Sequence, residues 1–383
     1  MTNYINVAII LSMIDRYLER QLLGALDDGL VTILYGARQV GKTTLATKIL
    51  SNVQNGLYLD CDDPAVSVRL RNQSLAGLKS LIGNAELIVV DEAQRVENIG
   101  LTAKLIHDSL PDKKLLLTGS SSLDLANKIK EPLTGRSCEL LLYPLALTEL
   151  THSVVEADGY MQRLLVYGGY PGLWGLREKE AANKARELAN RYLYRDAFAL
   201  RTIYNQTIID NLLRLLAHQV GSEVSYNELA GSLEISKDTV MRYIDLLEKA
   251  FIIFRLPQFR KNQRVQIGRL RKIYFYDLGI RNALIDDFKA IELRGDIGAL
   301  WENFIIVERL KKHQKAEKYV RSYYWRSRDR QEIDLVEESA TEYQAFECKW
   351  KKTPQISIGF KTRYPEIPVT GVTKNNYWDL LNL

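Results

Sequence analysis

Short apolar runs alternate with amphipathic segments in the first part of the chain. Three runs, at 31–35, 86–90 and 114–118, have the length and the apolar character of buried strands, and a fourth run covers 138–142. The segment that follows the first run has a helical pattern as far as Leu50. Strands that alternate with helices predict an α/β fold for this part of the chain.

The middle of the chain has a helical period instead. Residues 160–200 are predicted to be helical, with an interruption at the turn cluster 167–172. Ser225 and Glu228 form a capping box ahead of a short helix. A second helix is predicted over 236–249, with one apolar face made of Val240, Tyr243, Ile244 and Leu247. Two short helices joined by a tight turn are typical of a helix-turn-helix, and we expect 251–256 and 257–259 to follow as a hairpin wing.

The last part of the chain predicts a helix and a small sheet. An amphipathic helix covers 298–310, and strands are predicted at 323–326, 332–336 and 345–350. Because side chains alternate along a strand, Glu347 and Lys349 share one face. Asp334 lies opposite to its neighbours Ile333 and Leu335, so it is expected to approach Glu347 and Lys349 from the preceding strand. Glu302 would reach the same place from the helix.

The N-terminal apolar run Val7–Met13 is too short for a membrane span, which needs about 20 apolar residues. We expect it to belong to an amphipathic helix that continues through Leu18, and we expect no membrane partner. Met13 is as good a candidate for the biological start as Met1, because the sequence from there already has the pattern of a domain opening.

Length and composition place the chain among globular proteins. It has 383 residues, of which 46% are hydrophobic and 26% charged, and this predicts two or three domains. The net charge of +5 neither requires nor excludes a nucleic-acid partner. Three widely spaced cysteines give no disulfide framework and no zinc pair, which favours the reducing cytosol, a cytoplasmic location.

A phosphate-binding loop follows the first predicted strand. Gly36 to Thr43 fills every fixed position of G-x-x-x-x-G-K-[ST], between a strand and a helix. The glycines let backbone N–H groups surround phosphates, and the helix N-terminus adds partial positive charge. Lys42 would reach the β- and γ-phosphates of ATP, and the Thr43 hydroxyl would bind Mg²⁺. The nucleotide-binding residues expected here are Gly36, Arg38, Gly41, Lys42, Thr43 and Thr44.

The next two strands end in polar residues that complete an ATP site. Asp91, at the end of 86–90, is expected to hold Mg²⁺ as a Walker B acid, and Glu92 is the natural general base for the attacking water. Thr118 or Ser120, after the strand 114–118, is the candidate sensor of the γ-phosphate. An ordinary strand end with solvated acids is the competing interpretation.

Arg136 is a candidate arginine finger that acts on the nucleotide of a neighbouring subunit, which implies a homo-oligomer. A surface arginine in a turn explains the same spacing. The guanine-specific N-K-x-D motif is absent, since 127–130 lacks the acid, and this disfavours a GTPase. A separate acidic pair on its own strand fits hydrolytic ATPases better than small-molecule kinases.

A basic segment follows the predicted helix-turn-helix. Between Phe251 and Tyr276 there is no acid and there are seven cations, namely Arg255, Arg260, Lys261, Arg264, Arg269, Arg271 and Lys272. Together with Lys237 and Arg242 on the second helix, they favour contacts with DNA phosphates. The alternative is a winged helix that serves protein packing, with its cations solvated.

The C-terminal carboxylates predict a second metal site. Glu302, Asp334 and Glu347 would bind Mg²⁺ or Mn²⁺, which polarises a phosphate and lowers the pKa of a bound water. Lys349 would position that water or stabilise the transition-state charge. A sheet whose solvent face carries these residues by chance is the alternative.

As a set, these motifs resemble a bacterial and archaeal family of AAA-type ATPases with a C-terminal DUF4143 domain. The resemblance covers nearly the whole chain from about Met13 and rests on 36–44, 90–94, 118–121, 133–136, 167–171, 274–279, 301–302, 325–326, 332–334 and 347–349. It implies an ATPase core at 13–145, a helical lid at 146–204, a winged-helix domain at 205–275, and at 276–383 an α/β domain similar to PD-(D/E)xK restriction nucleases. Glu302, Asp334, Glu347 and Lys349 match the pattern of that superfamily.

Two functions are therefore expected from the sequence. The first is a Mg²⁺-dependent ATPase that binds DNA through the winged helix and works on it or cleaves it through the C-terminal domain. The second is a nucleotide-controlled binding switch, in which the nuclease-like domain only holds a partner.

Overall fold

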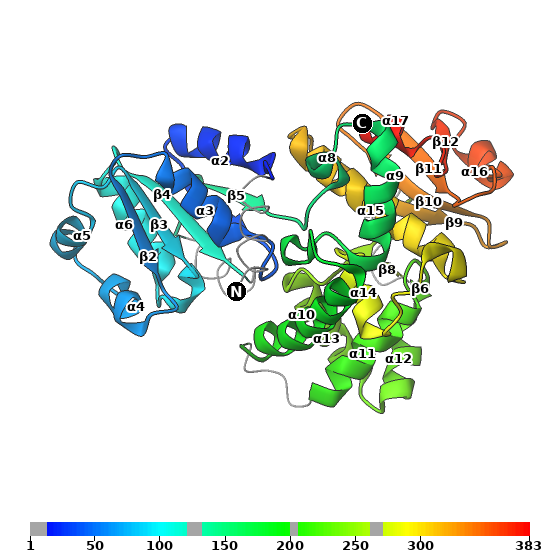
Figure 1. The fold of residues 1–383 in the computed structure, drawn as a ribbon, viewed down its shortest axis with the longest axis horizontal. Helices are drawn as coiled ribbons and strands as arrows, with labels where there is room; N and C mark the ends of the chain where they lie inside the picture. The colour runs from blue at the N-terminus through cyan, green and yellow to red at the C-terminus, as the bar shows by residue number, and fades with distance from the viewer. Residues whose placement is uncertain (1–13, 121–131, 200–205, 261–270) are drawn as a thin grey trace. The chain divides into compact units, whose positions relative to one another are not determined.

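The computed structural model describes residues 14–120, 132–199, 206–260 and 271–383. The chain separates into two compact units (Figure 1). Unit 1 comprises residues 1–143 with 249–251, and unit 2 comprises 144–248 with 252–383. Apart from 249–251, the segments that were expected beyond residue 145 therefore lie within unit 2.

Unit 1 is a parallel α/β sheet with the strand order β2-β3-β4-β1-β5. The predicted strands are confirmed, with ends that differ by one residue at most. The strands are β1 (Val31–Tyr35), β2 (Gly56–Asp60), β3 (Leu87–Asp91), β4 (Lys114–Gly119) and β5 (Ser137–Leu141). The helices are α2 (Leu18–Asp27), α3 (Lys42–Ser51), α4 (Pro64–Leu70), α5 (Leu75–Ile82), the 3₁₀ turn η1 (Ala93–Arg95) and α6 (Ile99–Ser109).

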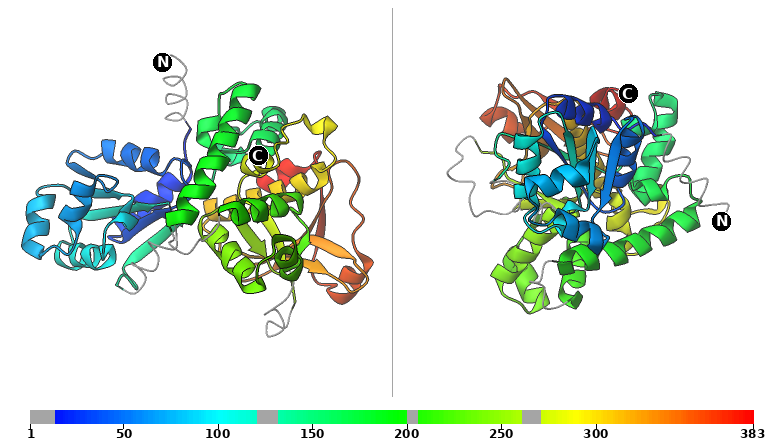
Figure 2. Two further views of the ribbon diagram at one scale, coloured as in Figure 1. Left: turned by 90° about the horizontal axis from the view of Figure 1, so that it is seen from below. Right: turned by 90° about the vertical axis from the view of Figure 1, so that its left-hand side faces the viewer.

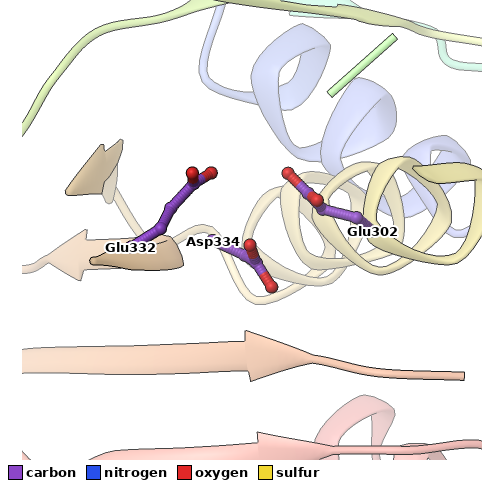
Figure 3. A group of neighbouring side chains, drawn as sticks. All are labelled: Glu302, Glu332 and Asp334. Atoms are coloured by element: carbon purple, nitrogen blue, oxygen red, sulfur yellow. The ribbon is translucent and has the colours of Figure 1, made fainter. Parts of the chain in front are cut away.

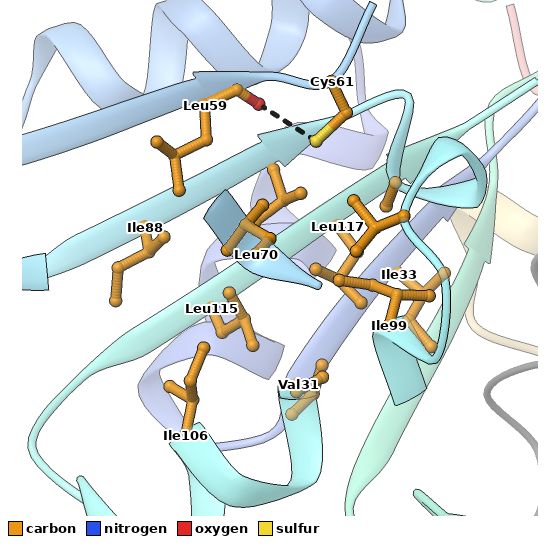
Figure 4. Packing of buried hydrophobic residues seen from close by; sticks show 14 of the residues in the cluster. Val31, Ile33, Leu59, Cys61, Leu70, Ile88, Ile99, Ile106, Leu115 and Leu117 are labelled. Atoms are coloured by element: carbon orange, nitrogen blue, oxygen red, sulfur yellow. Dashed lines mark hydrogen bonds between the residues drawn. The ribbon is translucent and has the colours of Figure 1, made fainter. Parts of the chain in front are cut away.

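Helices cover both faces of this sheet, which explains why β1 and β3 are buried at every position. On one face, residues of α4, α5 and α6 pack against alternate residues of the strands, such as Ile33, Ile88 and Leu117 (Figure 4). Helices α2 and α3 pack against each other and contact β1 and β4. The buried strands are therefore rigid supports for the loops at their carboxyl ends.

The N-terminal helix begins later than the sequence pattern predicts. Residues 1–13 lie outside the described part of the chain, and residues 14–17 form a bend and a turn. Helix α2 begins at Leu18, so a continuous helix from Val7 through Leu18 is wrong. Arg16 explains the turn, because its guanidinium donates to the carbonyl oxygens of Val40 and Tyr143 within unit 1.

The first half of unit 2 is mainly helical (Figure 2). Its elements are α8 (Leu147–Leu150), α9 (Val154–Tyr167), η2 (Pro171–Leu173), α10 (Glu178–Ala199), α11 (Gln206–His218), β6 (Glu223–Val224), α12 (Tyr226–Leu233), α13 (Lys237–Lys249), β7 (Ile253–Leu256), β8 (Arg271–Phe275) and α14 (Leu278–Leu284). The capping residue is confirmed, since the Ser225 hydroxyl accepts from the Glu228 N–H. The predicted apolar face of α13 is buried.

The predicted hairpin is wrong in its second strand. β7 pairs with β8 in the antiparallel sheet β6-β8-β7, and 257–259 does not fold back onto β7. Instead Gln258 bridges to Tyr324, and the Phe259 ring packs against Tyr323, Tyr343 and Tyr364. The physical reason is burial: Phe259 is 3% exposed in this aromatic cluster.

The second half of unit 2 is a four-stranded sheet with the order β12-β11-β10-β9. Its elements are η4 (Ile291–Leu293), α15 (Ile297–Lys315), β9 (Arg321–Arg326), β10 (Glu332–Glu338), β11 (Tyr343–Cys348), α16 (Ile358–Arg363), β12 (Val369–Val372) and α17 (Tyr377–Leu381). The predicted helix and three strands are confirmed. β10 has an irregular register against β9 between Ile333 and Val336, around Asp334, and such bulges re-aim side chains.

Candidate functional sites

The phosphate-binding loop has the backbone of an anion cradle. Gly41 caps α3 in a left-handed conformation, and no side chain caps the first N–H groups of this helix. A Cβ atom on Gly36 would lie 2.5 Å from the Leu142 carbonyl oxygen, so only glycine fits there. Lys42 is 5% exposed, and its Nζ donates to the carbonyl oxygens of Gly36 and Ala37 over 2.9 Å each. Arg38 is half-buried, and Thr44 is exposed one position after Thr43.

Asp91 joins three hydroxyl groups beside this loop. The Thr43 hydroxyl donates to its Oδ2 over 2.8 Å, and the Tyr58 hydroxyl donates to the same atom over 2.5 Å. The Thr118 hydroxyl donates to Oδ1. β4 lies between β3 and β1 in the sheet, so these groups come together from the ends of neighbouring strands. Thr43 and Asp91 are thus brought together as the sequence predicts.

Glu92 stands next to Asp91 with its carboxylate held by polar side chains. Its backbone is left-handed, with a φ of 50°. Gln94 donates to the Glu92 carboxylate, and the Ser120 hydroxyl lies 3.4 Å from the same oxygen. The two candidate sensors therefore differ: Ser120 contacts Glu92, whereas Thr118 is fully buried and contacts Asp91 and the Glu92 N–H.

Tyr58 and Gln94 are two site residues that received no role from the sequence. Gln94 lies inside the segment 90–94 on which the family resemblance rests, and its place two positions after Glu92 is the signal that could have found it. Tyr58 comes from the edge strand β2, and nothing local marks it. Burial and the bond to Asp91 raise the pKa of Tyr58, so its hydroxyl stays a donor at neutral pH.

These residues fit MgATP. The uncapped N-terminus of α3 and the Lys42 ammonium suit the phosphate groups, and Thr43 and Asp91 supply hard oxygen ligands for Mg²⁺. The Glu92 carboxylate lies beside these ligands and contacts the Ser120 hydroxyl.

Arg136 lies at the end of the sheet where the strands begin, whereas the phosphate-binding loop lies where β1 ends. It directly precedes β5, and its carbonyl accepts from the Val31 N–H at the start of β1, whereas the phosphate-binding loop follows the end of β1. The five residues of β1 separate these two ends by about 17 Å. The guanidinium donates to Asp108 over 2.8 Å and is partly exposed. Arg136 is therefore remote from the nucleotide site of its own chain.

In unit 2 the four predicted residues of the C-terminal site converge. Lys349 Nζ lies 2.7 Å from Glu347 Oε1 and 3.7 Å from Asp334 Oδ2, and Asp334 also accepts from the Cys348 N–H over 2.8 Å. Glu302 of α15 approaches Asp334 from the other side, with carboxylate oxygens within 4.8 Å. Asp334 and Glu347 are 4% and 6% exposed, so the competing picture of a solvated sheet face does not hold.

The structure adds Glu332 and Lys272 to this cluster. Glu302, Glu332 and Asp334 bring one carboxylate oxygen each within 4.8 Å of one another, and Figure 3 shows the three groups gathered between α15 and β10. Lys272 Nζ from β8 lies 2.8 Å from Glu302 Oε1, contacts Glu332, and lies 3.9 Å from Asp334 Oδ1. Glu332 is two positions from Asp334, so strand alternation is the signal that would have found it.

Crowded negative charge changes the acidity of the cluster. Burial, and then the charge of Asp334, raise the pKa of Glu302 and of Glu347 to about 7 each. Burial also raises the pKa of Asp334. Burial alone would lower the pKa of Lys272, but Glu302, Asp334 and Glu332 raise it, so Lys272 is a cation.

The basic segment is less available than its sequence suggests. Lys272 was counted among the cations of a phosphate-contacting surface, and this is wrong because it is 1% exposed and paired with acids from α15 and β10. Arg255 pairs with Glu248 and Asp245 of α13. Lys261, Arg264 and Arg269 lie outside the described residues. Lys237 and Arg242 are exposed on α13.

Three family models match successive parts of the chain. Residues 28–151 match an AAA domain, residues 159–290 match a domain of unknown function, DUF8612, and residues 297–373 match a second one, DUF4143. Across the described residues, no helix has the combined length and apolar character that crossing a membrane would require.

Curated relatives align with this chain across all three of these regions. The uncharacterized protein Rv2008c of Mycobacterium tuberculosis is 31% identical over 346 residues, which cover 89% of this chain and 75% of the relative. An uncharacterized protein of Haemophilus influenzae is 24% identical, with 93% and 92% covered. Among solved structures, the Walker-type ATPase PABY2304 of Pyrococcus abyssi shares the fold at 18% identity, with a TM-score of 0.50 over 71% of this chain and 96% of that one. The chain therefore belongs, with Rv2008c, to the family of AAA-type P-loop ATPases that carry a C-terminal DUF4143 domain.

Proposed function

We propose that this protein hydrolyses ATP with Mg²⁺ at the phosphate-binding loop of unit 1, with Glu92 as the general base. The observation that carries the proposal is the junction of three motifs at one point, where Asp91 accepts from Thr43 and Thr118 while Glu92 stands beside Ser120 and Gln94. A catalytic carboxylate has to be held still beside the metal ligands, and this network holds it.

Each residue then has one task. Lys42 exchanges its loop carbonyls for the β- and γ-phosphate oxygens. The Thr43 hydroxyl and the Asp91 carboxylate would hold Mg²⁺, which would neutralise phosphate charge, and the Tyr58 hydroxyl, which also donates to Asp91 Oδ2, orients that carboxylate. Glu92 takes a proton from the attacking water, while Ser120 orients that carboxylate.

Phosphate release by Glu92→Gln tests this proposal. We expect turnover to fall by about 10²- to 10⁴-fold, the usual value of a general base, with ATP binding retained. Glu97→Gln is the matched control, because Glu97 is exposed in the same segment and pairs with Arg71. Turnover of Glu92→Gln equal to that of Glu97→Gln would overturn the assignment.

A second proposed function is metal-dependent DNA cleavage by unit 2. The specific observation in its favour is the placement of Lys349 against both Asp334 and Glu347, which together can hold a divalent ion and stabilise phosphoryl charge. The order α11, β6, α12, α13, β7, β8 is that of a winged helix, and the exposed Lys237 and Arg242 of α13 suit phosphate contacts.

Cleavage of plasmid and linear DNA with Mg²⁺ or Mn²⁺, with and without ATP, tests the second proposal. Lys349→Ala should abolish cleavage, whereas Lys352→Ala, an exposed lysine three residues further on, should not. Dependence of cleavage on Lys42 would show that ATP controls it. Affinity for DNA should fall with log salt at a slope of about 0.9 per phosphate contact.

The rival proposal is a nucleotide-controlled binding switch, with unit 2 as a docking module. The effect of added DNA on ATP turnover distinguishes the DNA-processing enzyme from the binding switch. DNA should raise the ATP turnover of an enzyme that works on it and leave the turnover of a protein-binding switch unchanged. Intact DNA under every condition, together with a flat salt dependence, would establish the switch.

A further inference from the structure

The buried Lys272 ammonium occupies the position that a cation would take between Glu302, Glu332 and Asp334. We propose that Lys272 is a built-in replacement for a second metal ion, so that the C-terminal site takes a single divalent ion, held by Asp334 and Glu347. This inference rests on the proposed cleavage function and names the cations of that same site.

The first step is the geometry around Lys272 Nζ. It touches Glu302 Oε1 over 2.8 Å, contacts the Glu332 carboxylate and lies 3.9 Å from Asp334 Oδ1. The same three carboxylates are the group whose oxygens converge within 4.8 Å (Figure 3). A divalent ion bound there would lie against the ammonium, and at such a separation two positive charges in a buried site repel each other strongly.

The second step is that the strand pairing and the burial of Lys272 hold its ammonium group in this position. It lies on β8, the central strand of its sheet, in register with Glu223 of β6 on one side and Leu256 of β7 on the other. Its side chain is 2% exposed, and its ammonium lies 5.6 Å from the centre of the Tyr324 ring. Two residues along the strand, the Tyr274 hydroxyl donates to the same Glu302 oxygen over 2.5 Å.

The third step is an open acceptor on the other side of Asp334. Glu347 Oε1 accepts from Lys349, but the buried Glu347 Oε2 has no hydrogen-bond partner among the residues that the structure describes. A buried carboxylate oxygen without a partner costs free energy that a bound cation would recover. Asp334 presents Oδ1 to Lys272 and Oδ2 toward Lys349, so the second oxygen faces the Glu347 side.

The charge balance agrees with a single ion. Four carboxylates (Glu302, Glu332, Asp334 and Glu347) carry −4 when ionised, and Lys272 with Lys349 carries +2. The remaining −2 is neutralised by one Mg²⁺ or Mn²⁺. A second divalent ion would leave the buried site with an excess of +2.

The test is Mn²⁺ binding to the full-length, nucleotide-free protein, followed by calorimetry and by electron paramagnetic resonance. The number of ions that Asp334→Asn removes, from wild type or from a Lys272 variant, is the occupancy of the C-terminal site, because Asp334 faces both cation positions. We expect wild type to bind one such ion and to give the spectrum of an isolated Mn²⁺. Lys272→Met should bind two and give a spin-coupled pair, whereas Lys272→Arg, which keeps the charge, should still bind one.

A spin-coupled pair in wild type, or no ion that depends on Asp334, would overturn the inference. The wild-type spectrum decides even if Lys272→Met fails to fold. The outcomes also separate this inference from the proposed cleavage. One bound Mn²⁺ without DNA cleavage leaves the inference standing and removes the nuclease, and a coupled pair with cleavage does the reverse.

Discussion

The Asp277 carboxylate accepts a hydrogen bond from the Gly169 backbone N–H over 2.6 Å, across 108 residues of the chain. Its other oxygen accepts from the Ile280 N–H and caps α14. A Cβ atom on Gly168 would overlap the Asp277 carboxylate, and one on Gly279 would overlap the Tyr167 carbonyl oxygen. The glycine-rich turn at 167–171 and the segment 274–279 are therefore two halves of one packing contact.

Gly279→Ala should destabilise unit 2 through this contact. The added methyl group meets the Tyr167 backbone, which has no flexible side chain to move away, so we expect a loss of about 1–3 kcal/mol in the free energy of unfolding. Denaturant unfolding followed by circular dichroism measures it. Gly159→Ala in α9 is the matched control, because a Cβ there meets nothing within 4 Å, and helix propensity predicts a gain of about 0.5–1 kcal/mol. Equal stability of the two variants would contradict the packing role.

Lys42→Ala should weaken ATP binding by at least tenfold, because the buried ammonium beside the loop is the group placed to meet the phosphates. Titration with a fluorescent ATP analogue measures the affinity. Lys48→Ala on the same helix should bind ATP normally, since Lys48 pairs with Asp15 and Glu19 and not with the loop. If both variants lose the same affinity, the loop assignment is wrong.

Arg136→Ala should lose turnover in the assembled protein by a factor on the order of 10³, while ATP binding is unchanged. The reason is the position of Arg136 at the end of the sheet opposite to the phosphate-binding loop, from which it can serve only another subunit's nucleotide. Mixing Arg136→Ala with Lys42→Ala is the sharpest measurement. The mixture should recover activity that neither variant has, because one supplies the site and the other supplies the arginine. Full turnover by Arg136→Ala alone at high protein concentration would rule out the finger.

The raised pKa values of the carboxyl groups in the C-terminal cluster predict a pH-dependent stability in metal-free buffer. Burial and the charge of Asp334 raise the pKa of Glu347 from its ordinary value of 4.5 to about 7 in the folded protein. Between these values the folded state binds more protons than the unfolded state, so the contribution of Glu347 to the free energy of unfolding falls as the pH rises. Glu347→Gln removes this contribution. Its stability relative to wild type should therefore increase from pH 4.5 to pH 7 in EDTA, and a constant difference would contradict the shift.

The local motifs were predictable because each is complete within a few residues. A strand, a glycine-rich loop and a helix start are consecutive in the sequence, and Lys42, Thr43, Asp91 and Glu92 are placed by them. Most of the C-terminal site was also predictable, since Asp334 and Glu347 lie on neighbouring strands β10 and β11 and Lys349 follows directly after β11. The helix pattern at 298–310 then supplied the remaining predicted carboxylate, Glu302.

Charge pairing between distant segments was not predictable in the same way. The run from Phe251 to Tyr276 contains no acid, so its cations seemed free, yet Arg255 meets Glu248 of α13 and Lys272 meets Glu302, 30 residues later in the chain. Phe259 likewise left the predicted hairpin for an aromatic cluster built by later strands. In each case the competing interaction comes from a part of the chain that no local pattern includes.

By itself, then, the sequence determined most of the elements, the phosphate-binding motif and three of the four clustered carboxylates, because backbone periodicity and loop geometry act over short separations. Only the tertiary structure decided that Lys272 faces inward, that Arg136 lies away from its own nucleotide site, and that Tyr58 and Gln94 join the ATP site. The physical reason is that burial and Coulomb interactions depend on distance in space. These distances are established only when β8, α15 and β10 pack together.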